Sequence, residues 1–262
     1  MKRTLTFIFA FLTSHAYAFE EFVQDHDDGE TVVMTSLGNA NTASKSMVDG
    51  VEIEYEHDVD HFNASMDHYS ELTHDVLIGL GVNRMVLSEG GNARVTNEIR
   101  FDIISHHGPE AVAAYVSYAD REDERHEVAF GLEKELKLSS LSSTDGVFNL
   151  RLGINESNDE VEGGDYLRAG YSFRTLLMSN IQIKASVSGQ LERDVKYKET
   201  NLVVSSGPTI STGIGMAYRV TSGVFFNTDY VHVRTDAKQS NGWAATTTSD
   251  TNLLSAELML VF

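Results

Sequence analysis

The chain contains no cysteine, one tryptophan and two prolines among its 262 residues. Without cysteine it can form no disulfide, no thiolate metal site and no lipid-modified N-terminal cysteine. Both prolines, Pro109 and Pro208, fall in a predicted connection or near a strand end, where a β-protein tolerates them. After the N-terminus no stretch stays apolar over the about 20 residues that a transmembrane helix requires.

Basic residues are also scarce, with 20 Lys and Arg against 39 Asp and Glu and a net charge of −19. Nucleic-acid phosphates would repel such a chain, so its charge argues against nucleic acid as a partner. The charge does not distinguish a soluble secreted protein from a membrane protein. The length fits a single domain of the all-β kind.

The N-terminus predicts a signal peptide over residues 1–18. Met1-Lys2-Arg3 is a basic start, Leu5 to Leu12 is a short apolar run, and Ala16-Tyr17-Ala18 is a small-residue cleavage site. We expect cleavage after Ala18. A membrane anchor is disfavoured because the apolar run is far shorter than the about 20 residues needed to span a bilayer.

Alternation of apolar and polar residues recurs through the rest of the chain and predicts twelve β-strands. They cover residues 51–56, 62–67, 75–82, 95–103, 111–119, 127–133, 148–154, 167–174, 181–188, 210–219, 223–233 and 254–262. Ten or fourteen strands remain open, because Thr31–Ser36 could add one. Residues 19–46 are acidic and then rich in Gly, Asn, Ser and Thr, which predicts a periplasmic tail or a plug inside a barrel.

The last strand carries the clearest signal. From Leu254 to Phe262 every second residue is apolar, Ser255 and Glu257 lie between, and the chain stops on the aromatic Phe262. This pattern resembles the closing strand of bacterial outer-membrane β-barrels. The resemblance implies a closed antiparallel transmembrane β-barrel over residues 47–262, with apolar residues facing lipid and polar residues facing the lumen. Leu191–Gly207 is strand-like and predicts a hairpin that extends past the membrane.

A soluble β-sandwich or a lipocalin-like barrel would show the same alternation with the two faces exchanged. Two features favour the membrane barrel. The non-apolar positions are rich in Gly and Ser, where a soluble exterior would carry Lys and Glu. Aromatic residues also lie near predicted strand ends, as they do in membrane interfaces.

With this partition, charged residues line the predicted lumen. The predicted acidic pore-lining residues are Glu52, Glu54, Glu56, Asp67, Glu98, Asp102 and Glu257. The predicted basic ones are Arg151, Arg168, Arg174, Lys184 and Arg219. Acidic and basic residues should then face each other across the barrel. The electric field between the two sets of charges would orient small polar or zwitterionic solutes. Alternatively, the charges pair with each other and stabilise the interior. Inward Gly and Ser favour open space.

We find no convincing catalytic or metal site. His57, Asp58, Asp60 and His61 cluster in a predicted external connection, where solvated loop residues are commoner than a metal site. The His-x-Ser pattern with a following Asn that marks outer-membrane phospholipases is not found, so no enzyme, metal or cofactor is predicted. Trp243 is expected in the last external loop.

The sequence therefore predicts a narrow, passive, porin-like channel for small polar or charged solutes in the outer membrane of a Gram-negative bacterium. The alternatives are a closed structural or adhesive barrel acting through its external loops and, third, a lipid- or peptide-hydrolysing enzyme at the rim. Small porins for acidic oligosaccharides have a similar predicted architecture. We expect a monomer that contacts outer-membrane lipid, and lipopolysaccharide through divalent cations.

Overall fold

The computed structural model describes residues 29–48, 51–107, 110–121, 126–139, 144–240 and 244–262. Residues 1–28, which include the predicted signal peptide and its cleavage site, and Trp243 lie outside the described residues. The strands are β1 Thr31–Val48, β2 Val51–Thr73, β3 Val76–Glu89, β4 Asn92–His107, β5 Glu110–Arg121, β6 His126–Ser139, β7 Thr144–Asn155, β8 Val161–Gly163, β9 Tyr166–Met178, β10 Ile181–Glu192, β11 Val195–Tyr197, β12 Leu202–Ser206, β13 Thr209–Thr221, β14 Val224–Ser240 and β15 Ala244–Val261.

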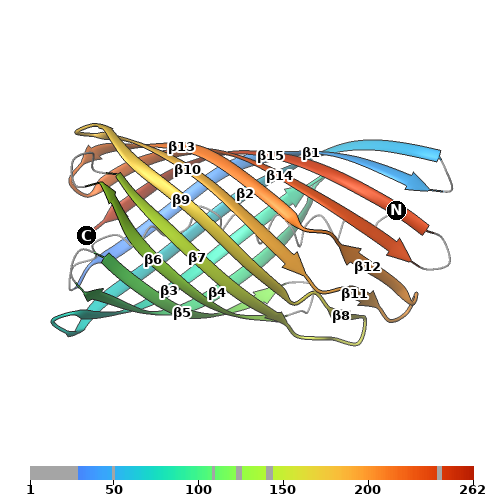
Figure 1. The fold of residues 1–262 in the computed structure, drawn as a ribbon, viewed down its shortest axis with the longest axis horizontal. Helices are drawn as coiled ribbons and strands as arrows, with labels where there is room; N and C mark the ends of the chain where they lie inside the picture. The colour runs from blue at the N-terminus through green and yellow to red at the C-terminus, as the bar shows by residue number, and fades with distance from the viewer. Residues whose placement is uncertain (1–28, 49–50, 108–109, 122–125, 140–143, 241–243) are drawn as a thin grey trace.

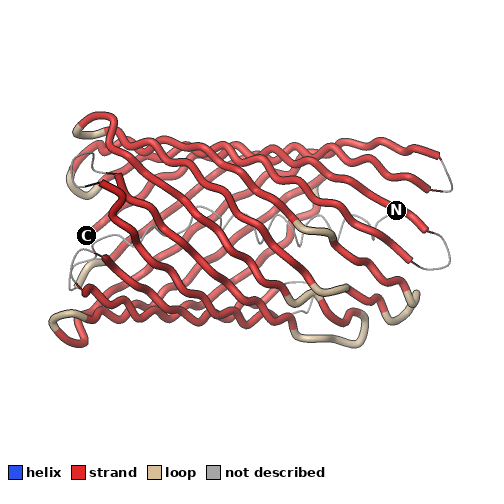
Figure 2. Tube along the Cα trace, viewed as in Figure 1, coloured by secondary structure: helices blue, strands red, loops and turns tan. Residues whose placement is uncertain are grey.

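Twelve of these strands close into one antiparallel β-barrel (Figures 1 and 2). Around the ring the order is β1-β2-β3-β4-β5-β6-β7-β9-β10-β13-β14-β15, and β15 pairs with β1 to close it. The short strands β12, β11 and β8 lie outside the ring, because β12 pairs with β14, β11 with β12, and β8 with β11. The predicted fold class and strand number are confirmed.

The assignment of the first strands was wrong in two ways: one strand was missed and another was counted as two, so the total of twelve was unchanged. The barrel begins at Thr31 and not at residue 47, since β1 pairs with both β2 and β15. The predicted strands 51–56 and 62–67 are one strand, β2. Along β2 the apolar residues change faces: Ile53 lies on the inner face, whereas Phe62 lies on the outer face. This change gave one strand the appearance of two.

Large apolar side chains cover the outer face of the barrel, and most charged side chains of its middle part are enclosed. On β15, Leu254 is 63% exposed and Phe262, which follows it at the end of the chain, 75%, whereas Glu257 points inward with Met259. The same exposure of large apolar side chains recurs around the ring. Examples are Leu80, Ile99, Phe130, Leu152, Leu167, Val187, Ile214 and Leu258. A soluble protein would bury these side chains, so the outer surface fits lipid.

The two ends of the barrel differ. We call the end with tight turns and the C-terminus the turn end; there, Phe262 and Thr31 exchange two backbone hydrogen bonds of 2.9 and 3.1 Å. At the opposite end, the loop end, the hairpins β1–β2 and β14–β15 project beyond the other strands (Figure 1). The predicted hairpin within Leu191–Gly207 forms there as β11–β12.

Candidate functional site

The inner surface of the barrel is shaped by glycines that lie directly opposite larger side chains. In each of these cross-strand pairs the larger side chain lies over the glycine, where any Cβ would overlap it or sit 2.8 Å away. The pairs are Tyr69–Gly79, Asp67–Gly81, Tyr115–Gly131, Tyr166–Gly153, Asp229–Gly215 and His61–Gly38. The inward glycines therefore let rings and carboxylates lie flat along the wall, which keeps these groups away from the barrel axis.

Five adjacent strands, β4 to β7 and β9, carry what we call the ionic wall. Its members are inward-facing charged side chains: Glu98, Arg100, Asp102, Arg121, Glu127, Glu133, Glu135, Asp145, Arg151 and Arg174. Acidic and basic residues alternate within this wall. The acidic members other than Asp145 are buried and the remaining members are half-buried, so these charges depend on partners of opposite sign.

Ion pairs at the centre of the ionic wall link strands that are not neighbours. Arg151 Nη2 lies 3.0 Å from Glu127 Oε1 and 3.5 Å from Glu98 Oε1, which connects β7 to β6 and to β4. Arg121 also pairs with Glu127, and the Tyr166 hydroxyl donates a 2.8 Å hydrogen bond to the same carboxylate. The contact between β4 and β7 therefore crosses the inner surface of the two intervening strands, β5 and β6.

Two further pairs extend the ionic wall. Arg100 contacts Asp102 at 2.6 Å, and its guanidinium lies 3.9 Å from the centre of the Tyr115 ring. Arg174 contacts Glu135 at 3.1 Å and Asp145 at 3.5 Å. Buried guanidinium groups are stable when several oxygen atoms and an aromatic face surround them. The ionic wall is therefore a fixed network of paired charges.

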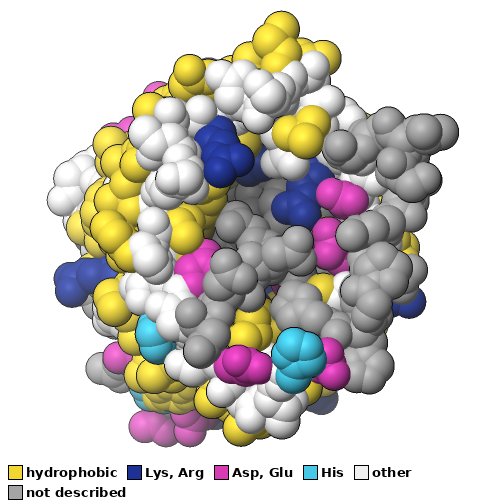
Figure 3. All heavy atoms as spheres, turned by 90° about the vertical axis from the view of Figure 1, so that its left-hand side faces the viewer, with side chains coloured by type: hydrophobic (Ala, Val, Ile, Leu, Met, Phe, Trp, Pro, Cys, Tyr) yellow, Lys and Arg dark blue, Asp and Glu magenta, His cyan; other side chains and the backbone are white. Residues whose placement is uncertain are grey.

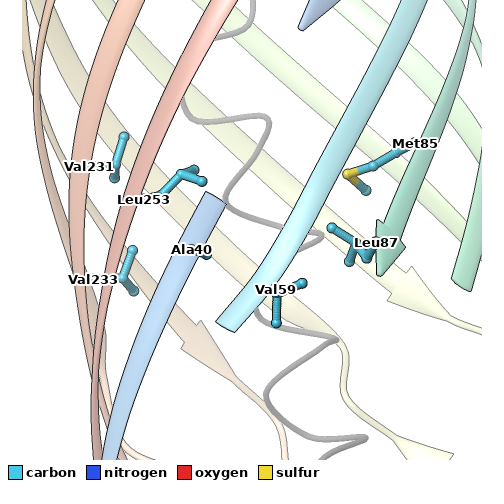
Figure 4. Packing of buried hydrophobic residues seen from close by; sticks show 7 residues of the cluster. All are labelled: Ala40, Val59, Met85, Leu87, Val231, Val233 and Leu253. Carbon is cyan, nitrogen blue, oxygen red and sulfur yellow. The ribbon is translucent and has the colours of Figure 1, made fainter. Parts of the chain in front are cut away.

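The opposite part of the ring carries what we call the apolar wall. It contains seven buried apolar residues from β14, β15, β1, β2 and β3, which point into the interior (Figure 4). They are Ala40, Val59, Met85, Leu87, Val231, Val233 and Leu253. In the strand order β1 and β6, the central strands of the two walls, lie almost half the ring apart. At the level of the apolar wall the interior is thus chemically two-sided, whereas nearer the turn end the same strands carry the inward acidic residues Asp67, Asp229 and Glu257.

Most of the residues predicted to line the lumen do point inward. Asp67, Glu98, Asp102, Arg168 and Lys184 are buried on the inner face. Arg151 and Arg174 belong to the ionic wall, Glu257 accepts a 2.6 Å hydrogen bond from Asn227, and Arg219 is at the turn end, with its guanidinium 5.9 Å from the centre of the Phe225 ring. Arg168 Nη2 lies 3.3 Å from Ser188 Oγ.

Three predicted positions were wrong. Glu52, Glu54 and Glu56 lie on the outer face of β2, in the part that projects at the loop end. The pairing of β2 with β1 has no register shift, and His61 and Asp67 point inward further along the same strand. Because side chains alternate between the two faces, the even-numbered residues of β2 must point outward. The expected separation into an acidic and a basic wall is also wrong, because both signs are mixed within the ionic wall.

The predicted loop cluster is likewise part of β2. His57 and His61 point inward, whereas Asp58 and Asp60 point outward and accept 2.9 Å hydrogen bonds from Asn41 and Asn39. The four side chains therefore do not converge. Among the residues that the structure describes, no group of three or more His, Cys, Asp or Glu could hold a metal ion.

Several inward residues were not among the predicted pore-lining set. Tyr115 and Tyr166 were missed because their glycine partners are defined by strand register, which alternation alone does not give. Met85 and Leu87 were missed because apolar residues were assigned to lipid. Figure 3, which views the turn end, shows side chains of both charge signs around the centre and apolar side chains on the flank.

The chain matches no family model and no curated protein sequence. Among solved structures, an outer-membrane channel from Pseudomonas putida aligns over 93% of this chain and all of its own, with a TM-score of 0.70 and 11% identity. A FadL homologue from Pseudomonas aeruginosa aligns over 88% and 90%, with a TM-score of 0.54 and 6% identity. The TodX monoaromatic hydrocarbon channel aligns over 90% and 91%, with a TM-score of 0.51 and 9% identity.

At these identities the likeness concerns the fold alone. Together with the exposed apolar belt and the enclosed polar face, it defines the class: the chain is a β-barrel of the kind found in bacterial outer membranes. Short turns face the periplasm and longer connections face the exterior in such barrels. By this rule we expect the turn end to be periplasmic and the loop end extracellular.

Proposed function

We propose that this protein is a passive outer-membrane channel for small amphipathic solutes, meaning molecules with a charged or zwitterionic group and an apolar part. The channel role is supported by the fold, which this chain shares with outer-membrane channels. The observation that carries the proposed solute class is the two-sided interior. A solute's charged group fits the ionic wall, and its apolar part fits the apolar wall.

The apolar wall has a physical consequence for permeation. A wide water-filled porin gains nothing from buried Val and Leu side chains on its inner face, because they remove hydrogen-bonding partners for water. A narrow channel removes part of the solute's hydration shell. Apolar side chains then favour passage of an apolar group, because burying its surface against them contributes about 25 cal/mol of free energy per Å². The proposed solute class is thus narrower than the small polar or charged solutes expected from the sequence.

Liposome swelling with two zwitterions of similar size tests the proposal. Leucine and asparagine share the amino and carboxylate groups and differ in the side chain. We expect leucine to enter liposomes containing the protein several-fold faster than asparagine. Replacing Val231→Thr and Val233→Thr keeps the side-chain shape, adds hydroxyls to the apolar wall, and should abolish the preference.

Val128→Thr is the matched control, because Val128 faces outward on β6. It should leave the preference unchanged. Equal rates for leucine and asparagine with the unmodified protein would overturn the proposed solute class. No swelling with either solute, together with no current in planar bilayers, would instead favour the closed barrel that acts through its external surface.

A further inference from the structure

The extracellular hairpin β1–β2 leaves one strand edge without a neighbour among the described strands. β2 pairs with β3 only from Asp60 onward, through Asp60–Ser88. Residues 51–59 of β2 pair with β1 alone, from Val51–Val48 to Val59–Ala40. This segment, which we call the free edge, projects at the extracellular end (Figure 1). An unpaired edge offers backbone N–H and C=O groups to an incoming strand.

The outer face of the free edge carries an acidic side chain at every second position: Glu52, Glu54, Glu56 and Asp58. On the side of β1 this row meets complementary groups. Lys45, directly opposite Glu54, pairs with Glu54 and lies 3.7 Å from Glu52, and Asn41 donates to Asp58. β1 thus provides an example of a neighbouring strand that meets this row with a basic residue and an amide donor. The other side of the row has no described strand.

The inner face of the free edge is apolar at its tip. Val51 is 62% exposed and Ile53 50% exposed, although both lie in a regular strand. A second strand placed beside β2 would cover them with its own apolar residues, as cross-strand neighbours do on one face of a sheet. The free edge is therefore complementary to a strand in which basic and apolar residues alternate.

A second copy of this chain does not meet that requirement. In an antiparallel pair, residues opposite each other point to the same face, so even-numbered residues of one copy meet even-numbered residues of the other. Every antiparallel register that pairs more than one residue of two free edges would then place Glu or Asp directly opposite Glu or Asp. Like charges directly opposite each other destabilise a sheet. The acidic row thus disfavours antiparallel pairing with a second copy, whereas a strand with basic residues would meet it favourably.

We propose that the free edge, residues 51–59, is a docking site for an extended segment of a partner polypeptide in which Lys or Arg alternates with apolar residues. The segment adds one strand to the extracellular sheet next to β2. Its basic side chains meet Glu52, Glu54 and Glu56, and its apolar side chains cover Val51 and Ile53. Backbone hydrogen bonds supply affinity and the alternation supplies specificity. This site is independent of solute passage through the barrel.

A peptide-binding measurement on the full-length protein in lipid nanodiscs tests the proposal. The probe is a nine-residue peptide that alternates Lys and Val, at about 0.15 M salt, where long-range attraction is screened within about 8 Å. Two control peptides are an isomer with the lysines grouped at one end and a peptide that alternates Glu and Val. We expect the alternating Lys peptide to bind at least tenfold more tightly than either control.

Charge reversal on the free edge gives the second arm. Glu54→Lys with Glu56→Lys should weaken binding of the Lys peptide at least tenfold and create binding of the Glu peptide. Glu160→Lys with Glu162→Lys makes the same charge change at the far edge of the extracellular sheet, next to and in β8, and should leave binding unchanged. Both variants alter exposed positions, either in the part of β2 that projects beyond β3 or at the edge of β8, so the ring should form in each.

Three outcomes would overturn the proposal. Equal binding of the grouped and alternating Lys peptides would show charge attraction without strand addition. Equal loss of binding in the two double variants would place the peptide elsewhere. A dimer of the unmodified protein in analytical ultracentrifugation that Glu54→Lys with Glu56→Lys disrupts would show that a second copy occupies the free edge.

Discussion

The ionic wall and the apolar wall are built from the same alternating strands, yet they stabilise the interior in different ways. In the ionic wall, charges that lost their hydration are offset by partners at 2.6–3.5 Å. The apolar wall requires only that Val, Leu and Met side chains be shielded from water. The first arrangement fails when one member is removed, whereas the second loses stability in proportion to the area exposed. The fold thus tolerates change on one side of its interior far better than on the other.

The sharpest test of this contrast is Arg151→Met against Val59→Ala. Removing the Arg151 guanidinium leaves Glu98 and Glu127 buried with less compensation, which should cost about 3–5 kcal/mol of unfolding free energy. Removing two methyl groups from the apolar wall at Val59 should cost about 1–2 kcal/mol. Urea unfolding in lipid vesicles, followed by far-UV circular dichroism, measures both.

Arg219→Met is the control for loss of an arginine as such, because Arg219 is exposed at the turn end and has no described carboxylate partner. Its unfolding free energy should stay within about 0.5 kcal/mol of the unmodified protein. If Arg151→Met proved as mild as Arg219→Met, the pairs of the ionic wall would contribute nothing to the stability of the barrel.

The glycines of the inner surface give the next largest effect. Gly131→Ala places a methyl group within the Tyr115 ring, and the ring cannot move without disturbing its contact with Arg100. We expect a loss of about 1–3 kcal/mol in the same unfolding measurement. Gly189→Ala is the matched control, because the nearest atom to its Cβ, the Thr209 carbonyl oxygen, lies 4.0 Å away. Equal effects of the two substitutions would mean that Tyr115 does not lie over Gly131.

The sequence predicted the barrel because its strongest signal is physical and local. A lipid-facing side chain must be apolar at every second position, and the Leu254–Phe262 segment meets this condition without exception. β1 was predicted only as a possible extra strand over Thr31–Ser36, because its later outward positions Asn39, Asn41 and Lys45 break the apolar alternation. Residues beyond the bilayer can form strands without the apolar alternation that contact with lipid requires.

The interior was predicted less well for a different reason. Whether Arg151 meets Glu98 depends on ring order and on the tilt of four strands, and neither property is local in sequence. Inward glycines suggested open space, yet Gly131 and Gly153 make room for tyrosines directly across the sheet. The residue type shows how much space a side chain leaves at a position. The strand register is needed to know which neighbouring side chain occupies that space.

The effect of the remaining inward arginines on permeating ions should be moderate. Arg168 is buried on the inner face and Arg219 is exposed at the turn end. Replacing both by Glu changes the local charge by four units and should raise the permeability of cations over anions several-fold in planar bilayers. Lys134→Glu with Arg234→Glu makes the same charge change on outward positions and should leave selectivity unaltered. Unchanged selectivity in the first variant would remove both arginines from the ion path.

The smallest effect concerns an exposed pair, for comparison with the buried ones. The hydrogen bond and the charge of Lys45 lower the pKa of Glu54 below its ordinary value. A carboxylate with a lowered pKa contributes stability above its unfolded pKa and loses it as pH falls through the folded value. Lys45→Met should therefore raise the pKa of Glu54, which NMR titration of its side-chain carboxyl measures. Because both groups are fully exposed, water and salt screen the pair, and unfolding free energy should not change measurably. A measurable loss of stability at neutral pH would show that the projecting hairpin depends on ion pairs as the ionic wall does, and the contrast between exposed and buried charges in this barrel would no longer hold.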